Sequence, residues 1–182
     1  MNDSLIPRRY AKALLKYCDE KGTQQRVYGL MNALIESFAA NPSLSEVIAN
    51  PFVANDEKRS LIMTAAGADA STDETLERFI TLLITNNRIG GLKEMALAYR
   101  DLYRRQEKIY PVKVTSAAPL SPDEERRLKE IIRGQLDGGS MEYTSAVDPD
   151  LLGGFVVDID SRQLDASIKN ELKQLRLKLL SK

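Results

Sequence analysis

The sequence predicts a mainly α protein in which an N-terminal six-helix bundle is followed by a small α+β domain of the order β-α-β-β-α. Up to about residue 108, apolar residues recur at the spacing of amphipathic helices. After Lys108, short stretches alternate between apolar and polar residues, as strands do. We therefore expect two domains, 1–108 and 109–182.

Helical periodicity is clearest in the second and sixth expected helices. The second has apolar residues at Val27, Leu30, Met31, Leu34, Ile35 and Phe38. The sixth has them at Leu92, Met95, Ala96, Tyr99, Leu102 and Tyr103. Because Gly, Pro and the residue before Pro disfavour helix, breaks are expected at 21–23, 41–42, 50–51, 67–72 and 86–91. Ser71 with Glu74 matches a capping box that would start the fifth helix.

The second domain begins with an expected strand at 110–116, where Pro111 favours an edge position. Ser121-Pro-Asp-Glu124 matches a capping box and predicts a helix with Leu128, Ile131, Ile132 and Leu136 on its buried side. Strands are expected at 141–147 and 155–159. A last helix is expected from about Asp165, with a seam of Ile168, Leu172, Leu175 and Leu179.

The stretch 148–160 combines two glycines with four carboxylates and must be tested as a phosphate or metal site. Phosphate-binding glycines follow a strand and open a helix, whereas Gly153 and Gly154 precede a strand. No glycine stands where a calcium loop requires one. We interpret the glycines as allowing a tight hairpin corner or bulge. The carboxylates are interpreted as a solvated face and a turn: Asp148, Asp150, Asp158 and Asp160.

Composition weakens the case for an enzyme and leaves only a mechanism based on Ser and Lys or on carboxylates open. The chain has no histidine, which is the commonest general acid/base and metal ligand, and one cysteine, Cys18, whose helical spacing from Leu14 predicts a core position. Lys and Arg together number 26, as do Asp and Glu, so no net charge favours nucleic acid or anionic lipid. No apolar run is long enough to span a membrane, and we expect no cleavable leader peptide at the N-terminus.

Two helices have apolar faces wider than a single core contact requires, since a surface helix needs a stripe a little over 100° wide. The first helix covers roughly 200° with Ile6, Tyr10, Ala11, Ala13, Leu14, Leu15, Tyr17 and Cys18. The fifth covers roughly 200° with Leu76, Phe79, Ile80, Leu82, Leu83 and Ile84. Either both helices are central in the bundle, or part of each face forms a groove for a partner's amphipathic helix.

The sequence resembles the delta subunit family of bacterial F-type ATP synthase, which includes the mitochondrial oligomycin-sensitivity-conferring protein. The resemblance covers essentially the whole chain. Its marks are Arg9-Tyr-Ala-Lys-Ala-Leu14, Asn50-Pro-Phe52 with Lys58, Phe79 to Leu83 with Asn87-Arg-Ile89, Val114-Thr-Ser-Ala117, Leu120-Ser121, Asp148-Pro149, Leu152-Gly-Gly-Phe-Val156 and Asp165-x-Ser167.

The resemblance implies a non-catalytic stator subunit with no cofactor, no metal and no catalytic residue. One copy would sit peripherally at the cytoplasmic face of the bacterial inner membrane and link the catalytic head to the peripheral stalk, so that the head does not rotate during proton-coupled ATP synthesis. In the family, the N-terminal helix of an alpha subunit lies in a groove between the first and fifth helices. The C-terminal domain contacts the b subunits.

Carried onto this chain, the resemblance implies groove residues Tyr10, Ala13, Leu14 and Tyr17, with Phe79, Ile80 and Leu83 opposite. The stalk side would use the strand after Gly154 and the closing helix, with Gly154, Phe155, Asp165, Ser167 and Leu172 as its residues. The alternative is an RNA-binding module in which the expected helix after Ser121 presents basic residues. Acidic residues interleave with them, which favours a solvated face.

Overall fold

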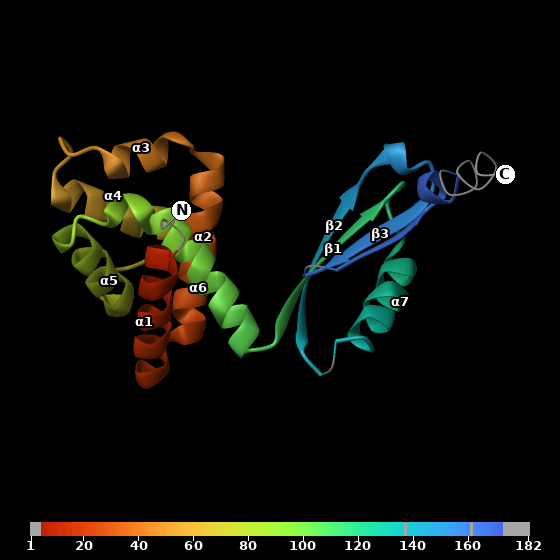
Figure 1. The fold of residues 1–182 in the computed structure, drawn as a ribbon, viewed down its shortest axis with the longest axis horizontal. Helices are drawn as coiled ribbons and strands as arrows, with labels where there is room; N and C mark the ends of the chain where they lie inside the picture. Colours follow the sequence, from red (N-terminus) through yellow and green to blue (C-terminus); the bar gives the residue numbers. More distant parts are fainter. Residues whose placement is uncertain (1–4, 137, 161, 173–182) are drawn as a thin grey trace. The chain divides into compact units, whose positions relative to one another are not determined.

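The computed structural model describes residues 5–136, 138–160 and 162–172. It divides the chain into two compact units, one ending at Arg105 and the other beginning at Gln106 (Figure 1). The predicted fold class, a helical bundle followed by a small α+β unit, is confirmed. Leu175 and Leu179 of the expected last helix lie outside the described residues.

Over its described residues, the N-terminal unit contains six α-helices, which are labelled in Figure 1, and a short 3-10 helix, η1. The helices are α1 (Leu5–Lys21), α2 (Gln24–Ala40), α3 (Ser43–Ala49), α4 (Asn55–Ala66), α5 (Glu74–Thr85), η1 (Ile89–Gly91) and α6 (Leu92–Gln106). The core contains the predicted stripes of α2 and α6, of which only Ile35 and Leu102 remain half-buried. Cys18 is fully buried, as its spacing predicts.

The start of α5 differs from the prediction. Its N-cap position is Asp73 rather than Ser71, and the Asp73 side chain does not cap the helix. The Ser71 hydroxyl instead donates to Asp69 Oδ1 at 2.6 Å. The predicted capping box at Ser71 is therefore wrong, because Ser71 is bound to Asp69 and Asp73 is bound to Arg26 of α2.

Over its described residues, the C-terminal unit is a four-stranded mixed sheet with the helix α7 packed on it. Its elements are β1 (Ile109–Ser116), α7 (Pro122–Arg133), β2 (Ser140–Val147), the 3-10 helix η2 (Pro149–Leu151), β3 (Gly154–Ile159) and β4 (Arg162–Ser167). The strand order is β2-β1-β3-β4: β1 pairs with β2 in parallel, and the other pairs are antiparallel. The predicted capping box at Ser121 and Glu124 is confirmed.

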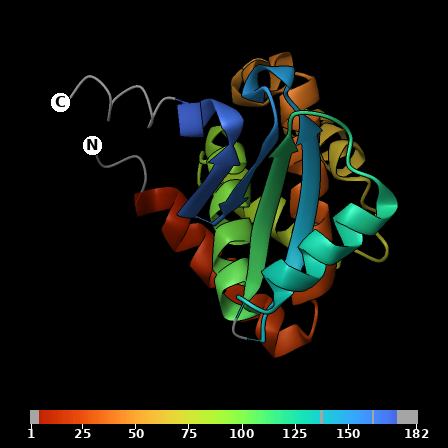
Figure 2. The same cartoon turned by 90° about the vertical axis from the view of Figure 1, so that its right-hand side faces the viewer.

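One face of the sheet carries the core of this unit. Val112, Val114 and Val157 of the strands pack with Ile132 and Leu136, which come from α7 and the residues after it. Phe155 and Ile159 pack against the same cluster, so alternate residues of β3 face the core. Figure 2 shows α7 lying across the β1 and β2 side of this face.

The strand β4 is a correction to the predicted element order, which places a helix from Asp165. The chain remains extended through Ser167, and helical residues follow at 168–172. Ser167 itself caps this helix: its hydroxyl oxygen accepts from the Asn170 backbone N–H at 3.2 Å. Asp165 Oδ1 accepts from the Ser167 N–H and hydroxyl, at 3.0 and 2.6 Å.

The expected edge position of Pro111 is also wrong, because β1 lies between β2 and β3. The Pro111 carbonyl accepts from the Asp160 backbone N–H at 3.1 Å, and the β1–β3 pairs begin one residue later, at Val112 and Ile159. Proline's missing N–H therefore falls beyond the end of that ladder, where no donor is needed. A central strand tolerates proline at this position for the same reason that an edge strand does.

Candidate partner-binding surfaces

Helices α1 and α5 lie side by side in the N-terminal unit (Figure 1), and polar contacts join them at two levels. The Asn86 side-chain amide donates to the Tyr10 hydroxyl at 3.3 Å. At the other level, the pKa of Arg78 is raised mainly by its hydrogen bond to Glu74 and further by the nearby Tyr17 hydroxyl. Since Tyr10 precedes Tyr17 while Asn86 follows Arg78, the two helices run antiparallel.

Between these two levels the surface is apolar. Leu82 lies four residues after Arg78 and four before Asn86, so it occupies the same helix face midway between the two contacts. Its side chain is 50% exposed. On α1, Ala13 is exposed between the half-buried Tyr10 and Tyr17. The α1–α5 surface, defined as Tyr10, Ala13, Tyr17, Arg78, Leu82 and Asn86, therefore has an apolar centre and polar ends.

The other four predicted groove residues lie beneath this surface. Leu14, Phe79, Ile80 and Leu83 are all buried, with Ile80 and Leu83 at 0% exposure. Much of the wide apolar face of each helix is thus used in the bundle's own core. Leu82 was not among the predicted groove residues, although its position on the fifth helix's wide face was visible in the sequence.

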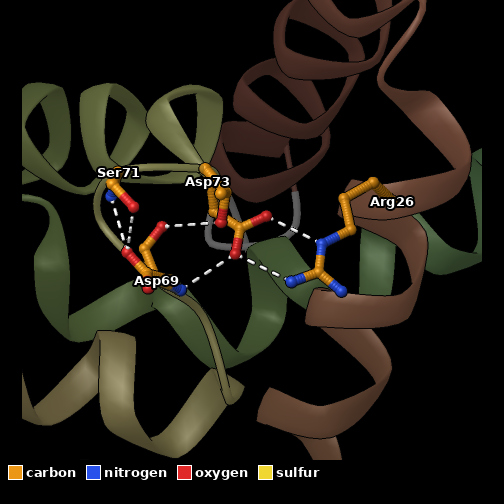
Figure 3. A network of polar contacts seen from close by, with 5 residues as sticks. Arg26, Asp69, Ser71 and Asp73 are labelled. Atoms are coloured by element: carbon orange, nitrogen blue, oxygen red, sulfur yellow. Dashed lines mark hydrogen bonds and ion pairs between the residues drawn. The ribbon is translucent and has the colours of Figure 1, made fainter.

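The start of α5 is attached to α2 by a charged pair (Figure 3). Arg26 donates to Asp73 through Nε at 2.7 Å and through Nη2 at 2.9 Å, and the Asp73 side chain is only 1% exposed. Asp73 Oδ2 also accepts from the Asp69 backbone N–H at 2.9 Å. Two-point binding by a planar guanidinium fixes orientation as well as distance, so this pair sets where the α5 side of the surface begins.

This pair predicts a specific acid response. The hydrogen bond from Arg26 is the largest cause that lowers the pKa of Asp73; burial opposes it, and the Asp69 N–H adds to it. Because the folded pKa lies below the unfolded value of about 3.9, the unfolded chain binds more protons between the two values. The stabilisation is therefore complete above the unfolded pKa and is lost as the pH falls through the folded pKa.

We expect Asp73→Asn to destabilise the N-terminal unit by about 1–3 kcal/mol at neutral pH and to flatten its pH dependence below about pH 4. Urea unfolding between about pH 2.5 and 7 measures both effects. Asp56→Asn is the control, since the Asp56 side chain is 91% exposed on α4. A destabilisation by Asp73→Asn that stayed constant down to the lowest pH would contradict the assignment.

The structure brings the stalk-side candidates of β3 and β4 together in the C-terminal unit, and Leu172 lies beyond them. Gly154 pairs with Ser167, and Phe155 pairs with Ala166, across β3 and β4. Phe155 faces the core and Ser167 is buried as a helix cap, whereas Asp165 is exposed. Leu172 is exposed in the helical residues beyond this corner. Other exposed apolar side chains nearby were not predicted from the sequence: Leu152, Leu164 and Ile168.

The glycines at the start of β3 allow a close approach rather than a hairpin corner or bulge. A Cβ on Gly154 would lie 2.2 Å from the Ala166 carbonyl oxygen, and Gly154 has φ +74°. A Cβ on Gly153 would meet the Ile168 side chain at 2.5 Å. The predicted hairpin corner is therefore corrected: these glycines let β4 and the start of the following helix pack directly onto the backbone.

The carboxylates of this stretch form local hydrogen bonds. Asp148 accepts from the Asp150 backbone N–H at 3.0 Å, and Asp158 accepts from the Gln163 side chain at 2.8 Å. Within residues 5–136, 138–160 and 162–172, no group of three or more potential metal-ligating side chains is found. Over the same described ranges, no helix has the length and apolarity that a bilayer crossing requires.

Two of the four basic residues of α7, on which the RNA-binding alternative depends, form ion pairs along their own helix. Lys129 Nζ lies 2.6 Å from Glu125, and Arg126 forms an ion pair with Asp123. Lys129 also lies over the Tyr143 ring at 4.2 Å. These two pairs reduce the positive field that phosphate binding would need.

The described part of the chain thus offers contact surfaces on a mainly helical scaffold. A family model for the ATP synthase delta (OSCP) subunit matches residues 6–179. The ATP synthase subunit delta of Bacteroides thetaiotaomicron is 37% identical over 182 residues, which cover 100% of this chain and 97% of that protein. The corresponding subunit of Bdellovibrio bacteriovorus is 33% identical, with 98% and 97% covered.

The fold has a counterpart in a solved structure, a chain of the Toxoplasma gondii mitochondrial ATP synthase hexamer. The TM-score is 0.72 at 19% identity, with 96% of this chain and 97% of that chain covered. The protein is therefore a non-catalytic subunit of a multisubunit complex rather than an enzyme in its own right. It belongs to the ATP synthase delta (OSCP) subunit family.

Proposed function

We propose that this chain is the stator subunit that links the N-terminal helix of an alpha subunit to the b subunits of the peripheral stalk in a proton-translocating F-type ATP synthase. One copy per complex would lie peripherally at the cytoplasmic face of the bacterial inner membrane. Residues 1–108 would bind the head and residues 109–182 the stalk. Family membership supports the setting, and the α1–α5 surface with its exposed Leu82 carries the head-binding half.

The alpha-subunit helix would lie along the α1–α5 surface and bury its apolar centre. Ala13 lets the partner's backbone come close, Leu82 supplies apolar area, and Tyr10 and Tyr17 border both ends. Leu14, Phe79, Ile80 and Leu83 would support the surface from beneath without direct exposure. Because the four are buried, they would hold the two walls at a fixed separation, which a rigid clamp needs.

A stator must resist torque without dissociating. Burial of apolar surface yields about 25 cal/mol per Å2 and is little affected by salt, whereas exposed ion pairs are screened. An apolar seat therefore gives the slow dissociation that a permanent link requires. The same logic predicts that a charge placed at its centre is the most damaging single change that leaves the bundle folded.

We expect Leu82→Asp to weaken binding of a synthetic peptide of the alpha subunit's N-terminus by at least about tenfold. The variant loses part of the roughly 1.5–3 kcal/mol that full burial of a Leu side chain supplies, and it buries a carboxylate. Fluorescence anisotropy with labelled peptide measures the affinity. Leu61→Asp is the matched control, because Leu61 is also partly exposed, at 36%, but lies on α4.

In membranes, Leu82→Asp should abolish proton-coupled ATP synthesis while the head still hydrolyses ATP, since the catalytic sites lie elsewhere. Circular dichroism should show an unchanged helical content, because Leu82 is already half exposed to solvent in the folded chain. Wild-type peptide affinity together with normal synthesis in this variant would refute head binding at the α1–α5 surface.

A further inference from the structure

The sheet of the C-terminal unit is wider than α7, the helix that covers it among the described residues. Four strands at about 4.8 Å spacing span roughly 15–19 Å, whereas a helix with its side chains is about 10–12 Å across. Figure 2 shows α7 over β1 and β2, with β3 and β4 beside it on the same face. Among the described residues, no second helix lies on the β3 and β4 side of that face.

The uncovered strip is an apolar groove of about 610 Å3 between α7 and the strands β3 and β4. Its floor contains Phe155 and Ile159 of β3. Two of its apolar lining residues are largely exposed: Ile131 of α7 at 66% and Leu164 of β4 at 63%. We call this site the α7–β4 groove.

Leu164 shows why the groove belongs to the core face. It pairs with Val157, which is 2% exposed, and cross-strand partners in a sheet point to the same side. Leu164 therefore extends the row of core side chains onto the edge strand, where nothing from α7 reaches it. A core row that continues into solvent is characteristic of a surface completed by another element.

The charges around the groove favour one kind of occupant. Arg162 lines it, and Arg127 stands one helical turn before Ile131 on the same exposed face. Neither arginine forms an ion pair with another described residue. Glu124, which Arg127 also influences, is held by the Ser121 N–H and hydroxyl, and the lining residue Asp160 already interacts within the chain.

We propose that the α7–β4 groove binds an amphipathic helix of a second chain, with an apolar seam flanked by acidic residues. The seam would cover Ile131 and Leu164, and the flanking carboxylates would meet Arg127 and Arg162. The groove is apolar and has arginines beside it, which matches the apolar seam and the charged flanks of an amphipathic helix lying in a groove. This inference deepens the stalk-binding half of the proposed function and rests on it for the identity of the partner.

The test uses the full chain and two labelled synthetic helical peptides of about fourteen residues. Both carry the same leucine seam, with Glu on the flanks of one and Lys on the flanks of the other. We expect the Glu peptide to bind at least about tenfold more tightly at low salt, with the preference shrinking as salt rises. Equal affinities, or tighter binding of the Lys peptide, would overturn the proposal.

Variants then locate the binding. Ile131→Asp and Leu164→Asp should each weaken binding of the Glu peptide by about tenfold or more. Arg162→Glu should shift the binding preference toward the Lys peptide. Val147→Asp is the matched control, because Val147 is 51% exposed on β2 and does not line the groove. If circular dichroism shows that an aspartate variant does not fold, the test relies on Arg162→Glu, because Arg162 is exposed. An unchanged preference for the Glu peptide in Arg162→Glu would refute peptide binding in the groove.

The outcome separates this inference from the proposed function. If the Glu peptide binds in the groove while the Leu164→Asp variant still couples head to stalk in membranes, the groove stands and the stalk-binding role through it fails. If the peptide does not bind, the groove proposal fails, and binding of the alpha-subunit peptide at the α1–α5 surface is unaffected.

Discussion

Leu83→Ala should lower the free energy of unfolding of the N-terminal unit by about 2–5 kcal/mol, whereas Leu82→Ala should cost less than about 1 kcal/mol. The two leucines are neighbours on α5, but Leu83 is fully buried and Leu82 is half exposed. Truncating Leu83 loses its transfer free energy and leaves a cavity among close-packed side chains. Leu82 gives up only a partial contact with its own helix neighbours.

Urea unfolding followed by circular dichroism at 222 nm measures both variants, since most helical residues lie in the N-terminal unit. The pair also separates stability from docking. Leu82→Ala should weaken binding of the alpha-subunit peptide while leaving the unfolding midpoint nearly unchanged. Leu83→Ala should lower the unfolding midpoint but, at temperatures where the variant stays folded, leave peptide binding nearly unchanged. Equal losses of stability in the two variants would show that the assignment of core and surface on α5 is wrong.

Helical periodicity predicted the bundle but could not distinguish its core from its docking surface. The roughly 200° apolar faces of α1 and α5 follow from the sequence, yet Phe79, Ile80 and Leu83 within one of them are buried by the chain itself. Burial depends on which helices become neighbours, and that is decided by contacts distant in sequence. The pairing of Tyr10 with Asn86 spans 76 residues and leaves no local signal.

Capping shows the same limit on a shorter scale. Ser121 and Glu124 form the predicted capping box, and both residues are exposed. Ser71 matched the same pattern with Glu74, but Asp73 is drawn to Arg26 of α2, and the helix begins after it. Local capping preferences of about 1 kcal/mol are overridden when a charged pair from another helix fixes the turn.

The missed strand β4 has a different cause. Between Arg162 and Ser167 the only large apolar residue is Leu164, so the alternation that marks a half-buried strand is barely present. The segment is extended because β3 offers it a complete antiparallel ladder, from Gly154 with Ser167 to Ile159 with Arg162. An edge strand that one neighbour holds needs little hydrophobic pattern of its own.

Gly154→Ala should destabilise the β3–β4 pair by more than about 2 kcal/mol and raise amide hydrogen exchange there by at least about thirtyfold. Two costs combine. The backbone has φ +74°, where a Cβ is strained, and that Cβ would lie 2.2 Å from the Ala166 carbonyl oxygen. Because the clash is with backbone, no rotamer change relieves it, and the ladder between Gly154 and Ser167 must open.

Gly138→Ala is the matched control, because Gly138 has φ +78° but a Cβ at that position would meet nothing within 4 Å. It carries the backbone strain of about 1–3 kcal/mol without the collision, and it lies in the turn before β2, away from the β3–β4 ladder. Hydrogen exchange of the intact chain, followed over peptides that cover 154–167, separates the two effects by location. Faster exchange confined to those peptides in Gly154→Ala, together with weaker binding of the acidic helical peptide, would tie the close backbone approach at Gly154 to the shape of the α7–β4 groove. Unchanged exchange there would mean that β4 is not held by this contact, and the exposed row ending at Leu164 would lose its structural basis.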